Sequence, residues 1–202
     1  MTPSFPRLLP IAALLAAALW LATAAALAEP VTGTVQVRAG RSLEGSLVWL
    51  VPAVRPAAGW PVPPPAVMDQ RLQTFAPHVL VVRKGQQVDF PNTDIIRHNV
   101  FSPSAARPFN LGIYPPGQRR SQTFDTVGVV ALLCNVHAQM SAFIVVVDTP
   151  HFSVTDSEGR FAIAGVPAGK YQAFAWHEGL VEATRSVELP GGALHFDLQD
   201  KK

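Results

Sequence analysis

Beyond residue 28, hydrophobic and polar positions alternate in short runs, and no segment keeps the 3.6-residue period of an amphipathic helix. The runs are rich in β-branched residues and are separated by Gly, Pro, Asn and Asp, which is typical of β-sandwiches. The pattern therefore predicts an all-β protein after residue 28. The predicted strands are Val31–Val37, Ser46–Val51, His78–Arg83, Gln87–Phe90, Asn99–Phe101, Arg120–Phe124, Val127–Leu133, Ala142–Asp148, Arg160–Ala164, Gly169–His177, Ala183–Leu189 and Ala193–Leu198.

The first segment, Met1–Ala28, has a different pattern. A single positive charge at Arg7 precedes a run rich in alanine and leucine, which ends in Ala26-Leu27-Ala28, with small residues at the two positions that a cleavage site requires. This pattern predicts a signal peptide cleaved after Ala28, and we expect export to the periplasm. An uncleaved anchor is the alternative, because the apolar run is near the length that spans a membrane. Pro10 and the alanine-rich composition favour cleavage, which would leave no stable membrane span.

Composition and charge narrow the class of protein. The chain has 202 residues, of which 49% are hydrophobic and 15% are charged, as expected for a folded globular protein. The formal net charge is +2, and it falls to +1 when residues 1–28 are removed, because they hold one arginine and no acid. A charge so close to zero predicts neither nucleic acid nor an acidic membrane as a partner.

Proline marks the first boundary within the chain. Pro52–Pro65 holds six of the nineteen prolines, and such a segment favours a stiff, extended linker over a strand inside a sheet. A second boundary is expected after residue 149, at Pro150. We therefore expect a separate block at residues 66–149, flanked by residues 29–51 and 150–202.

The one cysteine of the chain, Cys134, has no disulfide partner within it. An unpaired thiol in an exported protein needs a reason, and we favour metal ligation over a buried inert thiol or an intermolecular disulfide. His137 and Met140 follow at three-residue intervals, and thiolate, imidazole and thioether are soft ligands for a redox copper. His98 supplies the second histidine that a blue-copper set requires. From the spacing alone, zinc or plain core packing stays open.

Five segments around these residues resemble a cupredoxin, and the Cys-x2-His-x2-Met spacing is similar to that of amicyanin. The resemblance implies a Greek-key β-sandwich with one type 1 copper held by His98, Cys134 and His137, and by Met140 as a weak axial ligand. Asn99 resembles the asparagine that ties the ligand loops together. A redox partner protein is also implied. The segments are Phe75–Val82, Gly85–Phe90, Asn92–Asp94, His98–Val100 and Gly128–Met140.

The flanking segments resemble a carboxypeptidase regulatory-like domain, which is an Ig/prealbumin-like β-sandwich. Its opening is similar to Val31–Leu50 and its continuation to Val154–Tyr171, and in that family the two pieces are nearly contiguous. We therefore hypothesise a host domain, residues 31–51 plus 152–199, with the cupredoxin domain inserted in one of its loops. Two domains in series are the alternative. Under the insertion hypothesis Val35 or Val48 pairs with strands beyond Phe161.

With both parts, the chain resembles bacterial proteins labelled methylamine-utilization proteins. It has no Gly-x-Ser-x-Gly, His-Glu-x-x-His, phosphate-binding glycine loop or haem-attachment motif, so we expect no enzyme. The expected function is a one-electron carrier. Two alternatives stay open: a copper-handling protein without redox shuttling, and a surface interaction module with a vestigial copper site.

Four further histidines are interpreted as ordinary surface or core residues. His78 lies in the first predicted strand of the copper block and His195 in the last predicted strand. His151, His177 and Glu178 could in principle form a second metal site, because imidazole and carboxylate ligands bind zinc or type 2 copper.

Overall fold

The computed structural model describes residues 29–37 and 44–201. All secondary structure in these residues is β, which confirms the all-β prediction. No helix in the described part of the chain is long and apolar enough to cross a membrane. The predicted signal peptide lies outside the described residues.

The described residues contain eighteen strands, and each of the twelve predicted strands has a counterpart whose ends lie within two residues of the prediction. Five of the six additional strands have only two or three residues, too few for a periodic pattern. The strands are β1 (Val31–Val37), β2 (Leu47–Pro52), β3 (Ala66–Val67), β4 (Asp69–Arg71), β5 (Thr74–Ala76), β6 (Val79–Arg83), β7 (Gln86–Pro91), β8 (His98–Ser102), β9 (Phe109–Tyr114), β10 (Arg119–Phe124), β11 (Gly128–Leu133), β12 (Ser141–Val147), β13 (Phe152–Val154), β14 (Arg160–Ile163), β15 (Gly169–Trp176), β16 (Leu180–Val181), β17 (Ala183–Leu189) and β18 (Leu194–Asp200).

Strands from the two ends of the chain form one β-sandwich, here called the terminal sandwich. Its sheets have the orders β14-β1-β18-β16 and β13-β2-β15-β17. Val35 of β1 is paired with Phe196 of β18, and Val48 of β2 is paired with Ala175 of β15. Both pairings join the start of the chain to strands beyond Phe161. Its core is apolar and includes Leu50 and Leu180.

Residues 66–147 form a second sandwich, here called the central sandwich. One sheet has the order β6-β12-β11-β8-β9, the other has the order β10-β7-β3, and β4 pairs with β5 in a hairpin. The core between them contains Phe90, Phe124 and Leu132, together with Cys134 and Met140. Two of the predicted metal ligands therefore lie in the core of this sandwich.

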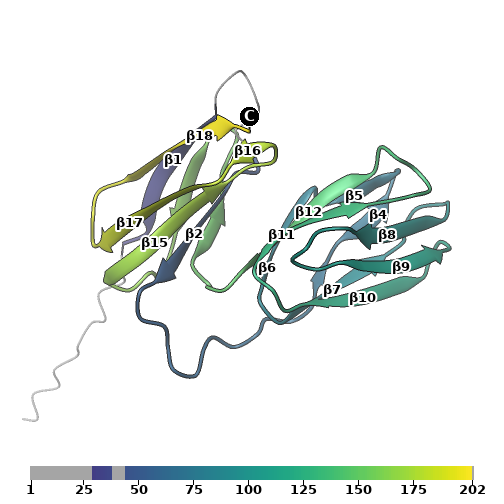
Figure 1. Ribbon diagram of the computed structural model, residues 1–202, viewed down its shortest axis with the longest axis horizontal. Coiled ribbons are helices and arrows are strands. Elements are labelled where there is room, and N and C mark those ends of the chain that lie inside the picture. The colour runs from purple at the N-terminus through teal and green to yellow at the C-terminus, as the bar shows by residue number, and fades with distance from the viewer. Residues whose placement is uncertain (1–28, 38–43, 202) are drawn as a thin grey trace, which may run out of the picture.

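The two sandwiches pack against each other through a third hydrophobic cluster. It joins Trp49 and Trp176 of the terminal sandwich to Val145 and Val147 of β12. Figure 1 shows β2 and β15 on one side of this junction and β6, β11 and β12 on the other. The Trp176 ring lies edge-on to Phe143, with 5.6 Å between the ring centroids. β12, which pairs with the strand that leads to Cys134, is thus buried on both faces over Ile144–Val147.

Candidate metal centre

The register between β8 and β11 brings His98 close to Cys134 and His137. β11 runs antiparallel to β8, and Leu133 is paired with Phe101. The chain that leaves β11 therefore moves toward the start of β8, where His98 is the first strand residue. Cys134 follows β11 directly, and the turn that carries His137 and Met140 leads into β12. A Met140 N–H to His137 C=O hydrogen bond of 3.0 Å closes this turn.

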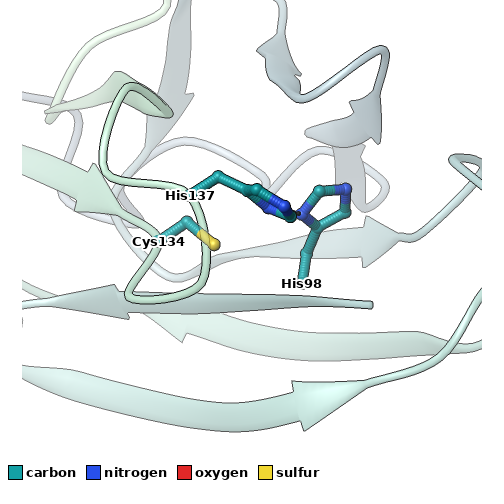
Figure 2. Close-up of side chains that lie close together, drawn as sticks. All are labelled: His98, Cys134 and His137. Atoms are coloured by element: carbon teal, nitrogen blue, oxygen red, sulfur yellow. Dashed lines mark hydrogen bonds between the residues drawn. The ribbon is translucent and has the colours of Figure 1, made fainter. Parts of the chain in front are cut away.

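His98, Cys134 and His137 converge on one point. Their ligand atoms all lie within 4.8 Å of one another, and no other three His, Cys, Asp or Glu residues among the described ones form such a group. The Nδ1 atoms of the two imidazoles are 3.1 Å apart, and the Cys134 sulfur faces them (Figure 2). His98 and Cys134 are buried, and His137 is partly exposed. The cluster fits a type 1 copper site, which takes two imidazoles and one thiolate in a trigonal set.

A carboxylate fixes the orientation of the buried imidazole. His98 Nε2 lies 2.9 Å from Asp94 Oδ2. An ionised carboxylate only accepts hydrogen bonds, so Nε2–H is the donor and the lone pair of His98 lies on Nδ1. This is the nitrogen that faces His137 and Cys134. Asp94 therefore selects the tautomer in which His98 can bind a metal in the cluster.

The Asp94 carboxylate is itself held by backbone donors. Its Oδ2 accepts the Gln73 N–H at 2.8 Å, and its Oδ1 accepts the Ile95 N–H at 2.7 Å. The Gln73 N–H bond and the His98 ring hold the pKa of Asp94 below its ordinary value. Asp94 is thus a fixed negative charge beside the His-Cys-His cluster, and its side chain is only 7% exposed.

The turn between β4 and β5 supplies one of these donors. Leu72 and Gln73 at its tip have φ angles of 50° and 54°, in the left-handed region that non-glycine residues seldom adopt. Besides its N–H bond to Asp94, Gln73 accepts a 3.0 Å hydrogen bond from Gln139 of the ligand loop through its side-chain oxygen. The β4–β5 turn therefore contacts both the Asp94 carboxylate, which positions His98, and the ligand loop.

Asn99 links the two ligand-bearing segments. Its Nδ2 donates a 3.1 Å hydrogen bond to Oδ1 of Asn135, the residue after Cys134. The donor to the sulfur is the Val136 N–H, at 3.4 Å from Cys134 Sγ. Asn99 thus ties β8 to the ligand loop, while a backbone N–H contacts the Cys134 sulfur.

Met140 lies in the same core cluster as Cys134 and is 1% exposed. Its position at the end of the ligand turn, directly before β12, is compatible with a weak axial ligand. That role stays a prediction.

The remaining histidines lie away from this cluster. His151 packs edge-on against Trp60 and Tyr171, and burial lowers its pKa. His195 Nδ1 is hydrogen-bonded to Thr34 at 2.9 Å. His151, His177 and Glu178 do not form a compact ligand group, whereas His78 contacts Glu178.

Sequence reasoning missed Asp94 and Gln73. The signal for Asp94 was available, because a carboxylate four residues before a ligand histidine is within reach of its ring when the intervening loop is tight. Asn92 makes that loop tight: its Nδ2 donates to Ile96 C=O at 2.9 Å. Gln73 acts through its backbone N–H, and no sequence pattern predicts that contact.

Several solved structures are similar to about half of this chain. The novel purple cupredoxin from Nitrosopumilus maritimus is 21% identical over 41% of this chain and 99% of its own length, with a TM-score of 0.38. An amicyanin variant in its reduced Cu(I) form is 21% identical over 50% of this chain and 98% of its own, with a TM-score of 0.39. The copper-containing nitrite reductase from Thermus scotoductus SA-01 is 25% identical over 49% of this chain and 26% of its own, with a TM-score of 0.41.

No family model and no curated protein matches the chain. The central sandwich carries a His-Cys-His cluster that fits a type 1 copper site. The terminal sandwich is not identified with a known family.

Proposed function

We propose that this protein is a one-electron carrier whose central sandwich holds one type 1 copper ion through His98, Cys134, His137 and Met140. The observation that carries the proposal is the convergence of three soft ligand atoms within 4.8 Å at the end of a sandwich core. Bound copper would supply the Cu(I)/Cu(II) couple. The proposed role requires no catalytic group.

The protein's contribution is a site that changes little when the metal changes charge. His98 is held by Asp94, and the ligand loop is tied to β8 by Asn99 and to the β4–β5 turn by Gln139. These contacts hold the ligands in position, so the ligands need little rearrangement when a metal binds. Burial of the thiol and of Met140 would keep water from a bound metal.

His137 offers the route for the electron, because it is the one partly exposed member of the His-Cys-His cluster. Exposed apolar side chains occupy the loops beside it: Leu72 is 86%, Ile95 89% and Val136 40% exposed. Apolar side chains on the surface around a ligand favour brief docking of a redox partner, which small interfaces of this kind support.

A copper-handling role is the second candidate. It requires release of the metal to an acceptor, and the buried positions of His98, Cys134 and Met140 oppose rapid release. We further propose that the protein reaches its working compartment, the periplasm, after cleavage behind Ala28; the mass of the mature protein recovered from the producing cell tests this.

Voltammetry of the copper-loaded protein tests the carrier role. We expect a reversible one-electron wave and fast electron self-exchange between Cu(I) and Cu(II) protein, measured by line broadening in NMR spectra. An irreversible wave, with copper passing to an apo-acceptor instead, would replace the carrier with the copper-handling role. Failure to take up copper would leave a vestigial site.

A further inference from the structure

A second set of side chains that can bind a metal, less compact than the first, lines a cavity where the two sandwiches meet. A cavity of about 380 Å³ is lined by His78 from the central sandwich and by Glu44, His177 and Glu178 from the terminal sandwich. His177 and Glu178 occupy the turn between β15 and β16. No lysine or arginine is among the described residues that line the cavity. Its lining therefore favours a cation.

Two of the ligand atoms are already in contact across the junction. His78 Nε2 lies 2.6 Å from Glu178 Oε2, and the two side chains are 53% and 45% exposed. Since the carboxylate accepts, the His78 Nε2 carries the proton in this contact. A metal ion can displace that proton and take both atoms as ligands, as it does at other histidine sites.

His177 presents a third ligand atom. Its Nδ1 lies 2.9 Å from the Glu178 backbone oxygen, which can only accept a hydrogen bond. Nδ1 therefore carries the proton, and the lone pair of the neutral ring lies on Nε2. This is the tautomer that a metal-binding histidine needs, fixed by a backbone acceptor.

We propose that this junction cavity binds a divalent transition-metal ion, Cu(II) or Zn(II), through His78, His177 and Glu178. Two imidazoles and a carboxylate, without thiolate or thioether, suit these ions, and Cu(II) is expected to bind more tightly than Zn(II). Binding brings His177 Nε2 to the pair that is already in contact. Because the ligands come from both sandwiches, the ion joins the two sandwiches at their junction.

The proposal is independent of the type 1 site and is tested by titration of the purified protein with Cu(II), followed by EPR. After the first equivalent, a second equivalent is expected to give a new signal with wide copper hyperfine splitting, unlike the narrow splitting of a blue site. The signal is expected to be lost in His78→Ala and in His177→Ala, and weakened in Glu178→Gln. Far-UV circular dichroism verifies that each variant is folded.

His195→Ala is the matched control, because His195 is also an exposed histidine but lies outside the cavity. It is expected to keep the second signal in full. A second signal that persists in both His78→Ala and His177→Ala, or none in the unaltered protein, would overturn the proposal. The wide signal is scored separately from the blue one, so loss of either leaves the other interpretable.

Discussion

The central and terminal parts of the molecule are both β-sandwiches, but they differ in the side chains that they bury. Among the described residues, the terminal core is apolar, and beside it the buried Ser46 donates a 3.1 Å hydrogen bond from its backbone N–H to Thr155 Oγ1. The central sandwich buries His98, Asn99 and Asn92 near one end of its core.

Burying polar groups is costly unless each finds a partner, and a network of them is retained only where it is satisfied or has a use. In the central sandwich the network leads from Asn92 through the loop to Asp94 and His98. The difference indicates that the terminal sandwich is stabilised by apolar packing, whereas the central sandwich also positions a site. The predictions below test this difference, beginning with the contact that the two regions share.

Trp176→Ala removes an aromatic contact between the two sandwiches. Trp176 is 5% exposed and packs on Phe143, so truncation is expected to lower the free energy of unfolding by about 3–5 kcal/mol. Urea denaturation measures the change. Trp60→Ala, at a half-buried linker residue, is the control and is expected to cost less. If Trp176→Ala lowered the free energy of unfolding no more than Trp60→Ala does, the expected contribution of the junction would be contradicted.

Asp94→Asn tests the link between the buried network and the metal ligands. The variant keeps the size of the side chain but removes the negative charge beside His98, so copper affinity is expected to fall by about 10- to 100-fold. The reduction potential is expected to rise, because the charge favours Cu(II) over Cu(I). Competition with a chelator and voltammetry measure the two effects.

Asp89→Asn is the matched control for Asp94→Asn. Asp89 also has a lowered pKa, which comes mainly from its hydrogen bond to Ser121 in the same sandwich. It does not contact a ligand, so its replacement is expected to leave copper affinity and potential unchanged. Identical behaviour of the two variants would separate Asp94 from the metal site.

Asn99→Ala removes the tie between β8 and the ligand loop. Loss of its hydrogen bond to Asn135 is expected to cost about 1 kcal/mol in the apo-protein, measured by urea unfolding. The copper hyperfine splitting is expected to change as well, because the loop that carries His137 loses a restraint. Asn110→Ala, which alters an exposed strand contact with Gly112, should leave the splitting unchanged. An unaltered spectrum in Asn99→Ala would contradict this role.

The smallest expected effect concerns His151, at the boundary of the terminal sandwich. Burial lowers its pKa, so the unfolded chain takes up this proton at a higher pH than the folded protein does. Stability is therefore lost as the pH falls through about 6.5, the ordinary value of the group. His151→Phe keeps a ring against Trp60 and Tyr171 and is expected to reduce this loss. Thermal unfolding at pH 7.5 and pH 5.5 gives the comparison, and equal losses in the two proteins would contradict it.

The sequence predicted the long strands other than β9, because their alternation or β-branched content is a local property. It also placed His98, Cys134 and His137 together, since the cysteine loop is short and cupredoxins bring a distant histidine to it. Strands such as β3 and β16, with two residues each, exist only through their partners in the fold, so no local pattern predicts them.

The packing of one sandwich on the other was not predicted, although two runs in the sequence indicate it. Leu47–Leu50 is buried at every position, and so is Ile144–Val147. A strand buried on both faces reads as a continuous apolar run and not as an alternation. These two runs therefore mark the sheets that meet at the junction. The contact between His78 and Glu178, 100 residues apart, follows from that packing and cannot be predicted locally.

The most direct test of the central claim is the visible absorption and EPR spectrum of the protein after addition of one equivalent of Cu(II), with Cys134→Ala measured alongside. The account predicts an intense thiolate-to-copper charge-transfer band and narrow copper hyperfine splitting, both lost in the variant. A pale protein with ordinary copper splitting, unchanged by Cys134→Ala, would contradict it.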